Sequence, residues 1–203
     1  MALGLLVSLA LVAEKATGQA LELVFDLSTP ATEISRYNAS DPADVSPGLA
    51  FGLGYYSRPA LEEGDRLRLG VLVGRRALRV SQSGSFTSEY DYSEFRIQGR
   101  VAVDILRSRN VAVCGEVALG LSFMSDNVPC NEMFCELPGT AIIATPCIRT
   151  NLRVSQRVSA LVEYKYSAYL DEPETTYPFK SGSVLAIGIE VSARKPKATG
   201  SDF

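Results

Sequence analysis

Apolar and polar residues alternate with a period of two along residues 94–105, EFRIQGRVAVDI. One face of this segment is uncharged and the other carries charges of both signs; the first contains Phe95, Ile97, Gly99, Val101, Val103 and Ile105, and the second contains Glu94, Arg96, Gln98, Arg100, Ala102 and Asp104. This period predicts a β-strand. A soluble barrel would turn the apolar face inward, whereas a membrane barrel would turn it outward to lipid.

The same alternation recurs in seven further segments. These are residues 21–27, 48–56, 66–74, 111–123, 141–154, 158–169 and 183–194. An even number of strands can close on itself, and most of the segments are near the roughly 9–11 residues that a tilted strand needs to cross a bilayer. The pattern predicts an all-β chain that forms an eight-stranded antiparallel up-and-down transmembrane β-barrel over residues 21–194. Pro146 lacks a backbone donor, so we expect a bulge or kink there.

The connections between these segments alternate in length. Those after the first, third, fifth and seventh segments are long and polar; they cover residues 28–47, 75–93, 124–140 and 170–182. Those after the second, fourth and sixth are shorter; they cover residues 57–65, 106–110 and 155–157. Long loops at one rim and turns at the other are typical of bacterial outer-membrane barrels. On the apolar face, Tyr164 and Tyr166 fall at the loop end and Tyr55 at the turn end, which predicts two lipid-facing aromatic girdles.

The chain starts with an apolar run over residues 1–13 that is too short to span a bilayer as a helix. Small residues, Gly18 and Ala20, stand at the third and first positions before a cut after Ala20. This arrangement predicts a signal peptide over residues 1–20, although no Lys or Arg precedes the apolar run. The alternative is that the run forms a first core strand or helix.

Strand number, alternation, loop asymmetry and the leading segment together make residues 21–194 resemble the small outer-membrane β-barrel family. This family includes outer membrane protein X and the barrel domain of outer membrane protein A. The resemblance implies a monomer in a bacterial outer membrane, with the lipid bilayer and lipopolysaccharide around it and surface or host ligands at its loops. Members commonly end in a strand whose last residue is aromatic. Here Phe203 follows a polar C-terminal tail that begins at Lys195.

In a membrane barrel the charged faces point into the lumen. The lumen then receives Glu22, Asp26, Arg66, Arg68, Glu94, Arg96, Arg100, Asp104, Glu116, Arg149, Arg153, Glu163, Lys165, Glu190 and Arg194. Charges removed from water need partners, so we interpret these residues as a network of ion pairs that fills the barrel. The alternative is a narrow gated ion channel along the same groups. We do not expect a pore of porin width, because the interior of an eight-stranded barrel is only about wide enough for side chains.

Composition removes several classes of function. The net charge of −3 argues against a nucleic-acid binder. The chain contains no His, which excludes Ser–His and Cys–His nucleophilic catalysis, and we therefore expect no enzymatic activity and no cofactor. A soluble lipocalin-like carrier with its apolar faces around a lipid is the rival architecture. The chain contains no Trp, a residue that lipocalins usually carry near their first strand.

Four cysteines allow three disulfide pairings and, if paired, imply an oxidising compartment. Cys130 and Cys135 lie in one predicted loop, whereas Cys114 and Cys147 share the lumen face of neighbouring predicted strands. We therefore expect the pairs Cys130–Cys135 and Cys114–Cys147. A zinc site made of the four thiolates is the alternative, but it would require all of them to meet at one point, and we expect no metal.

Overall fold

The computed structural model describes residues 19–27, 43–61, 66–83, 87–126, 140–170 and 181–192. Within these ranges, no helix has the length and apolar character of a membrane-spanning helix. The predicted leader up to Gly18, the tail from Lys195 and the pair Cys130–Cys135 lie outside the described residues. Ala20, the last residue of the predicted signal peptide, is the first residue of the first strand.

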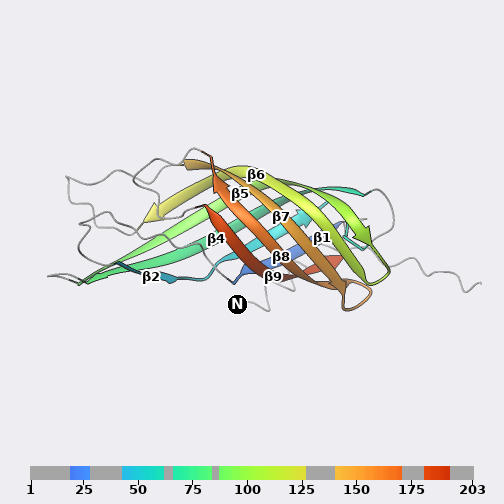
Figure 1. Cartoon of the computed structure of the whole chain (residues 1–203), viewed down its shortest axis with the longest axis horizontal. Coiled ribbons are helices and arrows are strands. Elements are labelled where there is room, and N and C mark those ends of the chain that lie inside the picture. Colours follow the sequence, from blue (N-terminus) through green and yellow to red (C-terminus); the bar gives the residue numbers. More distant parts are fainter. Residues whose placement is uncertain are drawn as a thin grey trace, which may run out of the picture.

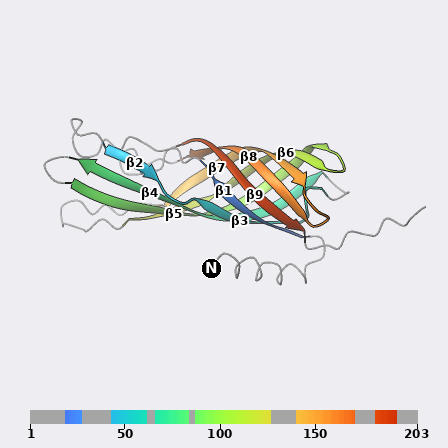
Figure 2. The same ribbon diagram turned by 90° about the horizontal axis from the view of Figure 1, so that it is seen from below.

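Antiparallel strands wrap around a single axis (Figures 1 and 2). They are β1 (Ala20–Asp26), β2 (Ala43–Pro47), β3 (Phe51–Tyr56), β4 (Leu67–Ser83), β5 (Thr87–Arg107), β6 (Val111–Asp126), β7 (Thr140–Arg153), β8 (Val158–Tyr169) and β9 (Gly182–Ser192). β1 pairs with both β3 and β9, and β4 pairs with both β3 and β5, so the sheet closes. β2 and β3 both pair with β4, one after the other along its length, but of these two only β3 pairs with β1, so β1 and β3–β9 are the eight strands of the barrel. The prediction of a closed eight-stranded antiparallel barrel is confirmed.

The apolar faces of the strands point outward. Val101 and Val117 are directly opposed on β5 and β6 and are 46% and 56% exposed, whereas their neighbours Ala102 and Ala118 are buried. The lipocalin-like carrier is therefore wrong for this chain, because its apolar ligand would have to lie against charged side chains. The predicted girdle residues Tyr55, Tyr164 and Tyr166 are also exposed on the outer surface.

The predicted loop over residues 75–93 is wrong. β4 and β5 continue as a paired hairpin from Leu67 opposite Val103 to Ser83 opposite Thr87. β2, which lies in the predicted loop 28–47, pairs with the far part of β4. These segments form a protruding sheet, made of β2, residues 78–83 of β4 and residues 87–92 of β5, which extends past the loop end of the barrel (Figure 2). Antiparallel backbone pairing does not require an apolar face, so hydrophobic alternation was a poor guide to where these strands end.

The register departs from regularity at Ile105 and not at Pro146. Pro146 is opposite Val117, and the register between β7 and β6 is the same before and after it. Pro146 has no paired residue on β8, but the register between β7 and β8 is also the same on both sides of the gap. β5 instead contains a bulge between Asp104 and Leu106, with Ile105 as the extra residue. The predicted turn from Leu106 was therefore placed too early. The bulge lies at the turn end, where β5 connects to β6, β7 to β8 and β3 to β4.

Candidate functional site

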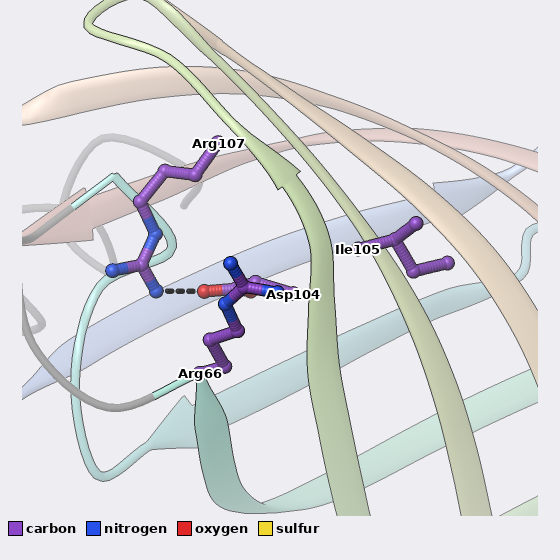
Figure 3. Close-up of a pocket in the computed structure, with 4 residues that line it drawn as sticks. All are labelled: Arg66, Asp104, Ile105 and Arg107. Atoms are coloured by element: carbon purple, nitrogen blue, oxygen red, sulfur yellow. Dashed lines mark hydrogen bonds and ion pairs between the residues drawn. The ribbon is translucent and has the colours of Figure 1, made fainter.

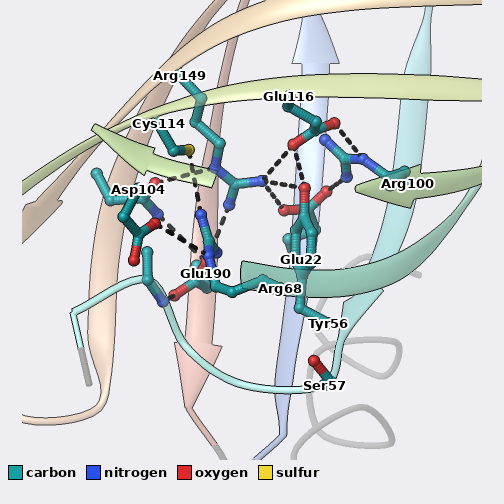
Figure 4. A network of polar contacts seen from close by, with 12 residues as sticks. Glu22, Tyr56, Ser57, Arg68, Arg100, Asp104, Cys114, Glu116, Arg149 and Glu190 are labelled. Atoms are coloured by element: carbon teal, nitrogen blue, oxygen red, sulfur yellow. Dashed lines mark hydrogen bonds and ion pairs between the residues drawn. The ribbon is translucent and has the colours of Figure 1, made fainter. Parts of the chain in front are cut away.

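The lumen contains a group of charged side chains near the turn end that is organised around Tyr56 (Figure 4). The Tyr56 side chain comes from β3 and is fully buried. The guanidinium carbons of Arg68, Arg100 and Arg149 lie 4.8, 4.9 and 5.1 Å from the centre of its ring. Cations at this distance from an aromatic face are stabilised by the ring quadrupole. Tyr56 thus holds together arginines from three different strands.

Carboxylates surround these arginines. The Tyr56 hydroxyl donates to Glu116 and accepts from Nη1 of Arg149 at 3.2 Å. Arg100 donates to Glu22 and Glu116, and Arg149 Nη1 lies 2.5 Å from Oε2 of Glu22. Each carboxylate therefore meets at least one guanidinium, as the cost of removing charge from water requires.

Glu163 extends this group along the barrel axis. Its Oε1 accepts from Nη2 of Arg100 at 3.2 Å and from Nη1 of Arg149 at 3.4 Å. Its Oε2 lies 3.6 Å from Nζ of Lys165. Lys165 then contacts Oδ1 of Asp26 at 2.6 Å, which connects the turn-end group to a second group near the loop end.

The loop-end group is built around Asp26 and Glu94. Oδ2 of Asp26 lies 3.3 Å from Nε of Arg76 and 3.5 Å from Nη2 of Arg96. Oε1 of Glu94 accepts from the hydroxyl of Tyr169 at 2.6 Å. Above these charges, buried apolar side chains form a cap at the loop end; they are Leu78, Met124, Ala141, Ile143 and Tyr169.

The turn end of the lumen is closed by the segment that follows β3. Ala60 and Leu61 in this segment are buried and pack against Ala112 of β6. The amide of Ala60 donates to Oε1 of Glu190 at 2.9 Å, and Arg153 donates to the carbonyl of Leu61 at 3.0 Å. We call Ala60 and Leu61 the plug. The plug and the apolar cap enclose the charged groups from both ends.

The charges of the lumen almost cancel. Among the described residues, the buried acidic side chains of the network are Glu22, Asp26, Glu94, Asp104, Glu116, Glu163 and Glu190, and the buried basic side chains are Arg68, Arg76, Arg96, Arg100, Arg149 and Lys165. Arg107, 19% exposed, adds a further positive charge through its pair with Asp104. An ion would have to separate these pairs to pass, so the arrangement favours a filled lumen over an open path.

The structure brings together most of the predicted lumen residues, with two exceptions among the described residues. Arg66 and Arg153 are exposed at the turn rim, because Arg66 comes just before β4 and Arg153 is the last residue of β7. Arg194 lies outside the described residues. Tyr56 and Arg76 were missed as site residues. Every second residue of a strand points inward, and Tyr56 falls on the same face as Gly52 and Gly54. Arg76 likewise falls on the same face as Arg68, beyond the end of the predicted strand. The alternation alone could therefore have identified both residues.

The predicted Cys114–Cys147 disulfide is not formed, since both cysteines are free and buried. The register places Cys114 opposite Arg149 and Cys147 opposite Glu116, so the two thiols are diagonal neighbours and not a direct pair. Sγ of Cys114 instead accepts from Nη2 of Arg68 at 3.1 Å. No group of side chains suited to holding a metal ion occurs in the described part of the chain.

Glycine makes room for the central side chains at two positions. A Cβ on Gly54 would lie 2.2 Å from Cγ of Glu22, and a Cβ on Gly70 would lie 2.7 Å from the ring of Tyr56. Both distances are far below van der Waals contact. Gly54 therefore leaves room for the side chain of Glu22, and Gly70 leaves room for the ring of Tyr56 and for the backbone carbonyl of Tyr55, whose oxygen would lie 2.5 Å from the Cβ.

No family model and no curated protein matches the chain. Among solved structures, the outer membrane protein OprG from Pseudomonas aeruginosa is similar, with a TM-score of 0.51 and 10% identity over 88% of this chain and 97% of that chain. Ail of Yersinia pestis gives TM-scores of 0.46 in a phospholipid bilayer nanodisc and 0.45 in a crystal, at 11% and 12% identity over 86% of this chain and 98% of that chain. The likeness to OprG confirms the resemblance to small outer-membrane barrels at the level of the fold.

Proposed function

We propose that this chain is an integral, non-enzymatic protein of a bacterial outer membrane, in which a sealed barrel anchors structures outside the bilayer. The observation that carries this proposal is the division between faces: the charges are buried and paired in the lumen, and apolar side chains cover the outer surface. Such a surface is soluble only in lipid. The chain inserts as a monomer and meets the bilayer along its apolar band, with lipopolysaccharide around its loop end.

The barrel serves as an anchor and not as a conduit. An ion that crossed the lumen would have to displace Arg149 from Glu22, Glu163 and Glu190, and each separation would leave a buried charge without its partner. Such separations cost several kcal/mol. The apolar cap and the plug add a barrier at each end.

The protruding sheet supports a role in surface contact. β6 pairs with β5 only as far as Tyr92, so residues 87–91 of β5 have a second edge without a strand partner among the described residues. The outer edge of β2 is likewise unpaired within the described part of the chain. Free strand edges present rows of backbone donors and acceptors to which another extended chain can add. The proposed partners are surface or host molecules at this end.

Membrane insertion is tested by expressing the full chain in a bacterium and comparing the outer-membrane fraction with and without boiling on a gel. A folded barrel gives a band in that fraction whose mobility shifts on heating. The variant Val117→Lys places a charge on the lipid face and reduces the shifted band, whereas Val117→Leu leaves it unchanged. Recovery of the wild-type chain as a soluble periplasmic protein would overturn the proposal.

Conduction is tested separately by reconstituting the purified chain in planar bilayers. We expect no current at any voltage from the wild-type chain. Steps of current from a preparation that also shows the heat-dependent mobility shift would identify a channel and would refute the anchoring role while leaving the barrel intact.

A further inference from the structure

A pocket opens at the turn end of the barrel, next to the bulge in β5. Arg66, Asp104, Ile105 and Arg107 line it, and its volume is about 220 Å³ (Figure 3). The backbone amide of Asp104 donates to the carbonyl of Arg66 at 3.0 Å, which fixes the start of β4 beside the end of β5. The pocket therefore lies on paired strands and not on a loose turn.

The bulge accounts for the position of Arg107. In a strand without the bulge, the side chain of Arg107 would point outward, as those of Val101, Val103 and Ile105 do. The extra residue shifts the pairing so that Leu106 is opposite Val113 and Arg107 is opposite the buried Ala112. Arg107 thus turns from the lipid side to the lumen side, where its guanidinium pairs with Asp104. Bulges commonly re-aim a side chain in this way near functional sites.

Among the described residues that line the pocket, arginines outnumber carboxylates. Asp104 is its one described acidic lining residue and is paired twice, with Arg107 and with Nε of Arg68 at 3.3 Å. Arg66 is exposed, and no carboxylate among the described residues pairs with it. Its guanidinium can therefore bind a further anion. The acidic residues of the stretch 62–65 lie outside the described residues.

Apolar surface adjoins the pocket on its outer side. Leu67, Ile105 and Leu106 are 52%, 65% and 60% exposed, and in Figure 3 Ile105 projects from the side of β5 opposite Arg66 and Arg107. The bulge exposes two consecutive apolar residues, so the outer apolar band reaches the rim of the pocket. A ligand that fits both surfaces has an anionic group and an attached hydrocarbon chain.

We propose that this pocket binds the phosphate group of an anionic phospholipid from the leaflet that surrounds the turn end. This proposal rests on the proposed membrane location. The planar guanidinium of Arg66 matches two phosphate oxygens, and Arg107, which is itself paired with Asp104, adds positive charge to the same pocket. The acyl chains lie along Leu67, Ile105 and Leu106. Basic pockets at membrane depth bind lipid head groups by the same combination.

The test uses the full chain, folded in detergent and offered equal amounts of phosphatidylglycerol and phosphatidylcholine, with retained lipids counted by native mass spectrometry. We expect the wild-type chain to retain phosphatidylglycerol at least fivefold over phosphatidylcholine. Arg66→Gln and Arg107→Gln should each reduce this ratio at least threefold. The matched control Arg157→Gln removes an equal charge from another turn of the same rim and should leave the ratio unchanged.

Two results would overturn the proposal. Equal loss of selectivity in all three variants would mean that overall charge at the rim attracts the lipid and that the pocket has no role. Displacement of the lipid by an equal concentration of inorganic phosphate would mean a site for free phosphate. Because each variant is first checked for the heat-dependent mobility shift, failure of lipid binding in a folded barrel is distinct from failure of the membrane proposal. If Arg107→Gln does not fold, Arg66→Gln alone tests whether the pocket binds the lipid.

Discussion

Two arginine–carboxylate pairs of nearly equal length occupy opposite environments in this molecule. In the lumen, Nη2 of Arg149 lies 3.0 Å from Oε2 of Glu190, and their side chains are 0% and 2% exposed. On the protruding sheet, Nε of Arg79 lies 2.8 Å from Oδ1 of Asp91, and their side chains are 58% and 52% exposed. Distance alone would rank the second pair as the stronger.

Solvent reverses that ranking. Water and salt screen the exposed pair, and pairs of this kind contribute little to stability. The buried pair gains little over a well-packed apolar core, but each of its members depends on the other, because a single charge left in the closed lumen has no water to solvate it. Ion pairs in the lumen are therefore necessary for the barrel to close around its buried charges. Ion pairs on the exposed surface contribute little to the stability of the fold.

The largest effect should follow from Arg149→Met. Arg149 contacts Glu22, Glu163 and Glu190, so its loss leaves several buried carboxylates short of a partner. We expect the free energy of unfolding, measured by urea titration in lipid vesicles, to fall by about 3–5 kcal/mol. Adding Glu190→Gln to Arg149→Met should recover part of this loss. A fall below about 1 kcal/mol would show that water reaches the lumen.

A charge on the outer surface should have a somewhat smaller effect. Val101→Arg places a guanidinium on the lipid face near the middle of the crossing part of β5, and the expected loss in the same titration is about 2–4 kcal/mol. The apolar control Val101→Leu should stay near the wild-type value. Equal stability of the two variants would contradict the assignment of this face to lipid.

Tyr56→Phe should have an intermediate effect. The variant keeps the ring between the three arginines but removes the hydroxyl that joins Arg149 to Glu116. We expect a loss of about 1–3 kcal/mol in the same titration. Tyr55→Phe removes the same atom from the adjacent, outward-facing residue and should cost about 0.5 kcal/mol or less. Similar losses at both positions would argue against a buried polar network around Tyr56.

The smallest effect should come from the exposed pair. The hydrogen bond from Arg79 holds the pKa of Asp91 below its ordinary value, on a part of β5 that lies beyond the apolar band. A pKa that is lower in the folded state gives a contribution that is present above the unfolded pKa and is lost as the pH falls through the folded pKa. We expect carbon NMR titration of Asp91 to show the lowered pKa, and Arg79→Gln to restore the ordinary value, with no measurable change in stability at pH 7. An unchanged pKa in Arg79→Gln would refute the pairing.

Sequence parity was sufficient to predict the barrel and most of its lumen. Charges at every second position, such as Glu94, Arg96 and Arg100, can face only one side of a strand, and closure of the sheet then brings them together. The outer band of Val101 and Val117 follows from the same rule. These features depend on local alternation, which a single sequence displays directly.

Other features depend on pairing between distant strands and could not be predicted in the same way. Side-chain polarity does not reveal that residues 75–93 form a paired hairpin, because its stabilising hydrogen bonds belong to the backbone. The bulge at Ile105 and the diagonal arrangement of Cys114 and Cys147 depend on register between neighbouring strands. Alternation within one strand restricts the register only to steps of two residues and does not choose among them.

The contact between the plug and Glu190 has a consequence for the order of assembly. Ala60 and Glu190 are separated by 130 positions in the chain, and Glu190 belongs to β9, the final strand. β9 also pairs with β1 and so completes the ring of strands. The plug can therefore reach its final position only after the last strand has arrived. The ring closes, the interior loses its water and the plug takes its place in one step at the end of folding. A chain stalled before this step has a water-filled groove in which pairs between distant strands, such as Arg149 with Glu22, are not yet made.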